Sequence, residues 1–144
     1  MAKHVLIISK DHIKVDPKRG QHIIEYPENN IFPSKQTEFI YNLFENTGAN
    51  FCIITHSPYI LGAINNLLLA GQIYAKTEDT NEIAEIIGYK SYIPINSFKA
   101  YQIVNGRKES IFNKETGLVA ENIIDDASEK LRAEFSLLLP LWHP

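Results

Sequence analysis

The stretch that decides the fold is FCIITHSPYIL, residues 51–61. Its first half, FCIIT, is a continuous apolar run of strand length, and such runs are typical of parallel strands buried on both faces of a sheet. Its second half opens a helix, because Ser57 suits the N-cap and Pro58 suits the first helical position. Apolar residues recur beyond it at helical spacing until Gly71, which we expect to end the helix. A buried strand that leads directly into a capped helix predicts an α/β protein.

A second strand and helix precede this stretch. Residues 22–26 form a short run of strand type that stops at Pro27, which has no amide hydrogen to continue a ladder. Residues 34–46 are predicted to form a helix, with Ser34 as its cap and Gly48 beyond its end. The apolar face of this helix is expected to contain Phe39, Ile40, Leu43 and Phe44. The order strand, helix, strand predicts a βαβ unit with two parallel strands.

The remaining segments are predicted from simpler patterns. Residues 5–9 form a β-branched run and are expected to be a strand, whereas residues 11–21 and 77–81 are polar and are expected to be loops. Residues 82–88 are too short a segment to assign. The fold class is therefore α/β, in one domain that spans residues 1–144.

The C-terminal third is predicted to contain a hairpin and a helix. Residues 98–104 and 109–112 flank Asn105-Gly106, a dipeptide that favours a tight turn between antiparallel strands. The last helix is expected at residues 121–139, ended by Pro140. Its predicted apolar stripe consists of Ile124, Ala127, Leu131, Phe135 and Leu138.

Composition limits the classes of function. The formal net charge is −3 over 144 residues, without the strongly basic balance of most nucleic-acid-binding proteins. Lys14, Lys18 and Arg19 are the nearest approach to a basic patch, and they are more simply a solvated loop. The single cysteine, Cys52, lies in an apolar run and cannot form an intrachain disulfide, which favours a reducing compartment. The apolar stretches are too short for a bilayer span or a secretory signal, so we expect a cytoplasmic protein.

Two polar residues stand where chemistry is expected. Glu25 ends one predicted strand and His56 follows the other, and the carboxyl ends of neighbouring parallel strands meet at one edge of a sheet. A carboxylate there suits Mg²⁺, and a histidine there can donate a hydrogen bond to a phosphate. Taken separately, each has a structural alternative, as a solvated strand end for Glu25 and as a capping or core histidine for His56.

Taken together, the two segments resemble one family. IEYPENNIFPSKQ at residues 24–36 resembles the Walker B and D-loop region of ABC-type AAA ATPases related to the overcoming-lysogenization-defect nucleases and the chromosome-maintenance ATPases. ITHSPYIL at residues 54–61 resembles their switch-histidine strand. Residues 101–106 and 117–135 are similar to the hairpin and terminal helix that follow, so the resemblance covers residues 22–138, the C-terminal half of such an ATPase. It implies a partial P-loop NTPase core with parallel strands, flanking helices and a C-terminal hairpin and helix.

The resemblance also implies roles for individual residues. Glu25 corresponds to the acid that holds Mg²⁺, usually through water, and His56 to the switch histidine near the terminal phosphate of ATP. Tyr26 corresponds to the catalytic glutamate that orients the attacking water. Asn29, Asn30 and Ser34 fall near the D-loop, which in the family crosses to the partner subunit.

Two departures from the family pattern weaken the case for catalysis. A phenol such as Tyr26, with an ordinary pKa of about 10, is a poor base at neutral pH. Glu28 lies two residues further on and could point the same way along an extended segment, although Pro27 intervenes. The phosphate-binding loop Gly-x-x-x-x-Gly-Lys-Ser/Thr is absent, because no two of the seven glycines are five residues apart and none precedes a lysine. We therefore expect no hydrolysis of ATP by this chain alone, since catalysis of phosphoryl transfer is mostly positioning and electrostatic stabilisation.

Three hypotheses follow. The chain is a non-catalytic ATPase-like module that binds or regulates, or it is one subunit of a split ATPase whose P-loop comes from a partner protein, or it is an unrelated small α/β domain. The last would be supported if the strands that end at Glu25 and Thr55 were neither adjacent nor parallel. The strand at residues 5–9 is expected to cover one edge of the sheet, and a homodimer is a second way to cover an exposed edge.

Overall fold

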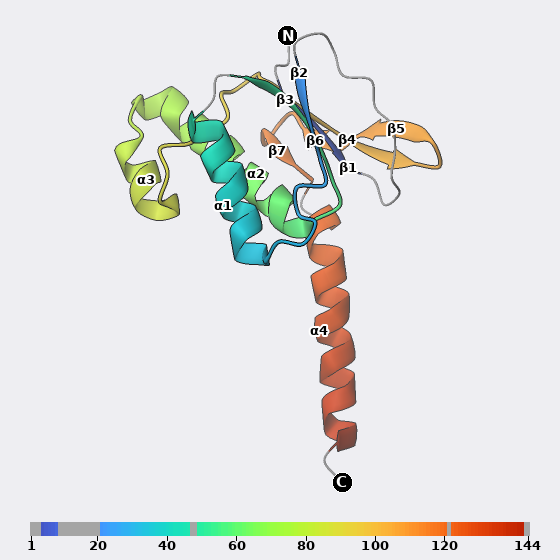
Figure 1. Cartoon of the computed structure of the whole chain (residues 1–144). Helices are drawn as coiled ribbons and strands as arrows, with labels where there is room; N and C mark the ends of the chain where they lie inside the picture. The colour runs from blue at the N-terminus through green and yellow to red at the C-terminus, as the bar shows by residue number, and fades with distance from the viewer. Residues whose placement is uncertain (1–3, 9–20, 47–48, 121, 143–144) are drawn as a thin grey trace.

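The computed structural model describes residues 4–8, 21–46, 49–120 and 122–142. A five-stranded sheet in the order β2-β3-β1-β4-β5 forms its centre (Figure 1). The first four strands of this order are parallel, and the fifth is antiparallel to its neighbour. The strands are β1 (His4–Ile8), β2 (Gln21–Glu25), β3 (Asn50–Thr55), β4 (Phe98–Val104) and β5 (Arg107–Ser110). The α/β class predicted from the sequence is confirmed.

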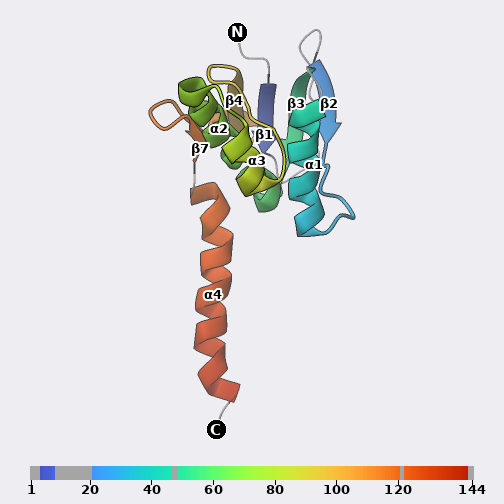
Figure 2. The ribbon, with the colours of Figure 1, turned by 90° about the vertical axis from the view of Figure 1, so that its left-hand side faces the viewer.

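Two helices, α1 (Pro33–Asn46) and α2 (Pro58–Thr77), cover one face of this sheet. The short α3 (Asn81–Ile87) follows α2 and lies farther from the sheet (Figure 1). In Figure 2, α1 and α2 lie side by side over the same face. The largest core cluster lies between them and the sheet, and it includes the fully buried Leu6, Ile40, Ile53, Ile60 and Ile64. The predicted βαβ unit is therefore present, with β2 and β3 parallel and joined by α1.

The position of β1 differs from the prediction. This strand does not cover an edge of the sheet, because it pairs with β3 on one side and with β4 on the other. All five of its residues are buried. Its apolar composition, HVLII, suits a central parallel strand, which is buried on both faces. Among the described residues, β2 stands at the parallel edge instead.

The end of α2 also differs from the prediction. The helix continues past Gly71 to Thr77, and Glu78 closes it in the left-handed conformation with φ 54°. Gly71 is needed inside the helix for another reason, since a Cβ there would lie 1.8 Å from the carbonyl oxygen of Ile93. The same segment is joined to α2 by a hydrogen bond from the Ile93 amide to the carbonyl of Leu67, at 3.0 Å. Glycine here permits close packing of backbone on backbone.

Of the two predicted N-caps, that of α2 is confirmed and that of α1 is wrong. Ser57 is the N-cap of α2 and Pro58 begins that helix, as predicted. Ser34 is not the cap of α1, because the helix already begins at Pro33, whose fixed φ suits a first helical position. The segment that the sequence left unassigned forms α3 and ends at Gly88 with φ 84°.

The predicted hairpin is confirmed. Asn105 (φ 50°) and Gly106 (φ 74°) form the turn between β4 and β5, and both adopt the positive φ that such turns require. The second strand begins at Arg107, two residues earlier than predicted. A smaller sheet of β6 (Phe112–Asn113) and β7 (Leu118–Val119) follows. Asn65 on α2 holds it, since its side chain donates to the carbonyl of Val119 and accepts from that residue's amide.

The last helix, α4 (Asn122–Trp142), projects away from the domain body (Figure 1). Pro140 does not end it, because a proline near the C-terminus removes only one hydrogen bond and keeps a helical φ. Of its predicted apolar stripe, Leu131, Phe135 and Leu138 are exposed rather than packed on the core. The side chains of residues 121–128 lie outside the described residues. The basic residues of the predicted loop at positions 14, 18 and 19 also lie outside the described part.

None of the helices in the described part of the chain combines the length and the hydropathy that a bilayer crossing requires.

Candidate functional site

The strand order of the sheet indicates that a ligand site could lie at the carboxyl ends of its parallel strands. β1 is followed in the chain by β2, which lies beyond β3, whereas β3 is followed by β4, which lies beyond β1. Neighbouring strands whose connections leave in opposite directions form a topological switch point, and ligands of open α/β sheets bind outside the carboxyl ends of such strands. At this edge β2 ends with Glu25, which is in register with Ile54, and β3 ends with Thr55.

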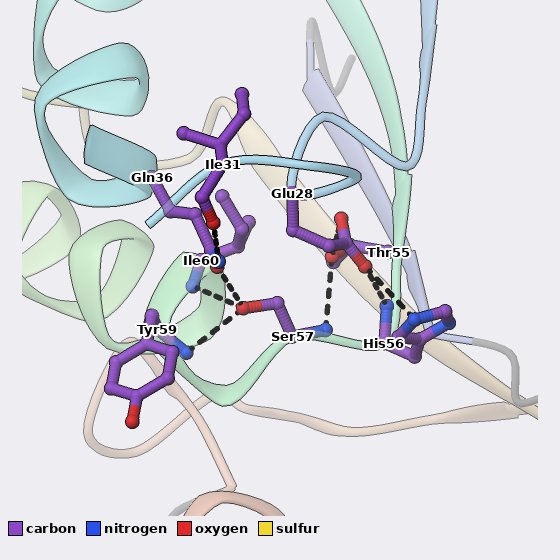
Figure 3. A network of polar contacts seen from close by, with 8 residues as sticks. All are labelled: Glu28, Ile31, Gln36, Thr55, His56, Ser57, Tyr59 and Ile60. Carbon is purple, nitrogen blue, oxygen red and sulfur yellow. Dashed lines mark hydrogen bonds and ion pairs between the residues drawn. The ribbon is translucent and has the colours of Figure 1, made fainter. Parts of the chain in front are cut away.

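A buried carboxylate lies just beyond these strand ends, and it belongs to Glu28 (Figure 3). Glu28 is 8% exposed. One of its oxygens accepts a hydrogen bond from Thr55 Oγ1 at 2.7 Å, and the other accepts one from the amide of His56 at 3.0 Å. The imidazole Nε2 of His56 lies 3.4 Å from the same second oxygen. The carboxylate therefore joins the segment after β2 to the end of β3.

A compact turn brings Glu28 to this position. The amide of Tyr26 donates to the carbonyl of Ile54 at 2.7 Å, which extends the β2–β3 ladder by one residue. Tyr26 then adopts φ +46° and Asn30 adopts φ +61°, so the chain turns sharply between them. The amide of Asn29 donates to the carbonyl of Tyr26 at 3.1 Å and closes the turn. The turn, rather than an extended segment, aims Glu28 back at β3.

A second group of polar contacts connects the two helices at the same edge. The hydroxyl of Ser57 donates to Gln36 Oε1 on α1 and accepts from the amides of Tyr59 and Ile60. Gln36 in turn donates through Nε2 to the carbonyl of Ile31 at 3.0 Å. Figure 3 shows that these contacts continue the network around Glu28, because Ser57 also donates through its amide to Thr55 Oγ1. One connected network thus joins the segment after β2, α1, β3 and α2.

The structure brings together two of the three predicted site residues. Tyr26 is buried, and its ring centroid lies 5.2 Å from that of His56. The His56 side chain is 47% exposed, so one part of the imidazole faces the surface. Glu25 is exposed at the end of β2, and the carboxylate beside His56 is that of Glu28. The D-loop candidates Asn29, Asn30 and Ser34 are exposed.

Sequence reasoning undervalued Glu28 and missed two other members of the network. It treated Pro27 as an obstacle to Glu28, whereas residues 27–30 form the turn that delivers the carboxylate. The sequence predicts Thr55 only as the last residue of a strand and gives Gln36 no role. The available signal was the composition of residues 27–30, Pro-Glu-Asn-Asn, because proline and asparagine favour a tight turn that could redirect the carboxylate between them.

The described residues do not by themselves fit ATP and Mg²⁺. The backbone amides at and just before the start of α2 that would bind a phosphate are already used, since those of Tyr59 and Ile60 donate to Ser57 and that of His56 donates to Glu28. Glu25 remains as one exposed carboxylate for a cation that prefers several oxygen ligands. Within the described ranges, no group of three or more His, Cys, Asp and Glu gathers in a way that could hold a metal ion.

A hollow of about 240 Å³ lies away from this edge, between the second half of α2 and the β6–β7 sheet. Leu68, Gln72, Ile95, Phe112 and Lys114 are among its lining residues, and no member of the Glu28 network is.

No family model, curated protein or solved structure matches this chain. The assignment of a function therefore depends on the geometry of the site and on the resemblance of its motifs.

Proposed function

We propose that this chain is an ABC-type ATPase-like domain that lacks the phosphate-binding loop, does not hydrolyse ATP alone, and acts as a binding or regulatory module. The core would be a partial P-loop NTPase core. The module would keep the edge at which the resembling ATPases hold Mg²⁺ and phosphate, with Glu25 and His56 in the corresponding positions.

One observation carries this proposal: the strands that end at Glu25 and Thr55 are adjacent and parallel. The two resembling motifs are separated by a whole helix in the chain, and a chance likeness of two short segments would not require them to meet at one edge. The aromatic contact between Tyr26 and His56 adds to this, because it joins the position of the catalytic glutamate to that of the switch histidine.

The contacts at the edge support a non-catalytic role. Glu28 and Ser57 already use the amide donors that a phosphate would need. Tyr26, at the position of the catalytic base, is buried and carries a phenol. Such a site holds its own segments together and offers little to stabilise a transferring phosphoryl group.

Calorimetry tests this proposal on the isolated chain. Titration with ATP and Mg²⁺ is expected to show no binding in the micromolar range, for the wild type and for His56→Ala alike. Micromolar binding by the wild type that is lost in His56→Ala would overturn the proposal. It would show that the carboxyl-end edge of β2 and β3 binds nucleotide without a phosphate loop. Circular dichroism of both proteins ensures that the comparison is made on folded chains.

A split ATPase is the second candidate, and the edge position of β2 favours it. Within the described part of the sheet β2 pairs only with β3, so a partner protein could add a strand on its outer side. This hypothesis predicts ATPase activity only when the chain is mixed with a P-loop-containing protein that co-purifies with it from the native source. Absence of any such companion would remove the split ATPase and leave the regulatory module.

A further inference from the structure

The hollow between α2 and the β6–β7 sheet has the size of a site for one small molecule. Its volume is about 240 Å³, and its lining comes from the second half of α2, from residues 93–96 and from residues 112–117. Figure 1 shows β7 beside α2, which brings the first and last of these segments together. Apolar cavities of about 150 Å³ hold a benzene molecule, whereas sites for drug-sized ligands span about 300–1,000 Å³. The hollow therefore suits a ligand between these two sizes.

The turn between β6 and β7 forms one wall of the hollow, and hydrogen bonds fix its shape. The Asn113 side chain accepts from the amides of Glu115 at 2.8 Å and Thr116 at 3.2 Å. Gln72 on α2 donates through Nε2 to the carbonyl of Thr116 at 2.7 Å and ties the turn to the helix. Gly117 permits this contact, because its φ is +71° and a Cβ there would lie 2.6 Å from Gln72 Nε2.

Residues 93–96 form a second wall, which is also fixed to α2. The amide of Ile93 donates to the carbonyl of Leu67 at 3.0 Å, and the Ser97 hydroxyl donates to the carbonyl of Pro94. Since hydrogen bonds within the chain hold both walls, the hollow is already formed without a ligand. Preformed concave sites of this kind are typical of small-molecule binding.

The lining combines an apolar surface with one charge of each sign. Leu68 and Ile93 are buried, and Phe112 is partly buried against the same core. Lys114 and Glu115 are the charged lining residues, and both are exposed. Neither side chain forms an ion pair or a hydrogen bond in the part of the chain that the structure describes. Both charges are therefore available to a ligand that packs on the apolar surface.

We infer that this hollow binds a small zwitterion with an apolar side chain, of the class of a free amino acid such as phenylalanine. The apolar side chain packs on the surface formed by Leu68, Ile93 and Phe112. The carboxylate of the ligand faces Lys114 and its ammonium group faces Glu115, so the two charges of the ligand match the two charges of the lining. An anionic ligand such as a nucleotide fits less well, because Glu115 repels it. The inference does not depend on the proposed function, since no member of the Glu28 network lines the hollow.

An NMR titration of the whole chain, which follows the backbone amides, tests this inference with L-phenylalanine. The usual affinity per non-hydrogen atom of a ligand predicts a dissociation constant of about 2 mM. The amides of residues 112–117 and 93–96 are expected to shift and to approach saturation. Absence of saturable shifts at these residues up to about 20 mM, ten times the expected constant, overturns the inference.

Three related compounds test which groups of the ligand are recognised. Compared with phenylalanine, 3-phenylpropionate lacks the ammonium group, 2-phenylethylamine lacks the carboxylate, and glycine lacks the apolar side chain. Each singly charged compound is expected to bind about fivefold more weakly, the upper range for one exposed ion pair. Glycine is expected to cause no saturable shift in the same range. Binding of either singly charged compound, or of glycine, as tightly as phenylalanine overturns the inference.

Substitutions of the charged lining residues locate the site. Lys114→Ala should weaken binding of phenylalanine about fivefold and remove the preference over 2-phenylethylamine, whereas Glu115→Gln should do the same relative to 3-phenylpropionate. Lys76→Ala and Glu85→Gln are the matched controls, because both residues are exposed and neither lines the hollow. The controls should bind as the wild type does, and circular dichroism checks that all four variants fold. Equal affinity of all four variants for phenylalanine would show that the charges of the hollow do not hold the ligand, and it would overturn the inference.

Discussion

Replacement of Glu28 by alanine should destabilise the protein more than any other change of an acidic residue in the described chain. The carboxylate is 8% exposed and accepts hydrogen bonds from Thr55 Oγ1 and the His56 amide. Hydrogen bonds to a charged group contribute about 1.5–3 kcal/mol each, and a donor left buried without a partner costs about 1–3 kcal/mol. The two contributions are not independent and the charge no longer has to be buried, so we expect a loss of about 3 kcal/mol of unfolding free energy.

Urea denaturation followed by circular dichroism measures this loss. With a slope of about 2 kcal/mol per molar, typical of a small domain, the midpoint of Glu28→Ala should fall by about 1.5 M. Glu38→Ala is the matched control on the surface of α1, where Glu38 forms an exposed ion pair with Lys35 at 3.0 Å. An exposed pair contributes about 0–1 kcal/mol, so this midpoint should hardly move. A midpoint for Glu28→Ala within about 0.25 M of the wild type would refute the reasoning.

A double-mutant cycle separates the two hydrogen bonds of the carboxylate. Thr55→Val removes the hydroxyl but keeps the shape, and its coupling with Glu28→Gln should be about 1–2 kcal/mol. His56→Ala keeps the backbone amide that donates to Glu28 and removes a half-exposed imidazole, so it should cost less than about 1 kcal/mol. If His56→Ala lowers the free energy of unfolding more than Thr55→Val does, the main contact that stabilises Glu28 is the imidazole and not the hydroxyl or the amide.

Three further predictions concern the scaffold. Gly71→Ala should lower the free energy of unfolding by about 3 kcal/mol or more, because its Cβ would meet backbone at 1.8 Å. Gly62→Ala is the control, since nothing lies within 4 Å of its Cβ, and it should raise the free energy of unfolding by about 0.5–1 kcal/mol. Urea midpoints of the two variants measure the difference. Ser57→Ala should cost about 1–2 kcal/mol through loss of the cap, and Ser34→Ala less than about 0.5 kcal/mol in the same assay. Burial raises the pKa of Cys52 from its ordinary 9.0, outweighing the opposite effect of a nearby lysine. Ellman's reagent should therefore react with Cys52 only after unfolding, and stability should fall as the pH rises above that ordinary pKa, where the unfolded thiol ionises and the folded one does not.

The features that the sequence predicted correctly are those set by local rules. Ser57-Pro58 specifies the start of a helix by its own hydrogen bonds and φ. Asn105-Gly106 specifies a turn by its tolerance of positive φ. The apolar run at residues 51–55 specifies a strand buried on both faces, and the order of segments then implies a parallel pair.

The features that the sequence did not predict depend on contacts between distant segments. Gly71 has the usual appearance of a helix end, and only the approach of Ile93 shows why glycine is needed inside the helix. The central place of β1 follows from pairing with strands that lie more than forty residues away in the chain. Glu28 was undervalued because Pro27 interrupts the extended segment that would have directed it to the site, whereas the left-handed backbone of Tyr26 turns the chain back.

The Glu28 network also sets a cost on nucleotide binding at this edge. The strained backbone of Tyr26 persists only where surrounding contacts determine it, and the hydrogen bonds of Glu28 are such contacts. A phosphate that takes the amide of His56 must first displace the carboxylate, and it therefore loses part of the roughly 3 kcal/mol worked out above. Since about 1.4 kcal/mol corresponds to tenfold in affinity, the full loss would weaken binding by about a hundredfold. A partner that supplies a phosphate loop would have to offset the part that is lost, so the network that stabilises the isolated domain also opposes its use as a nucleotide site.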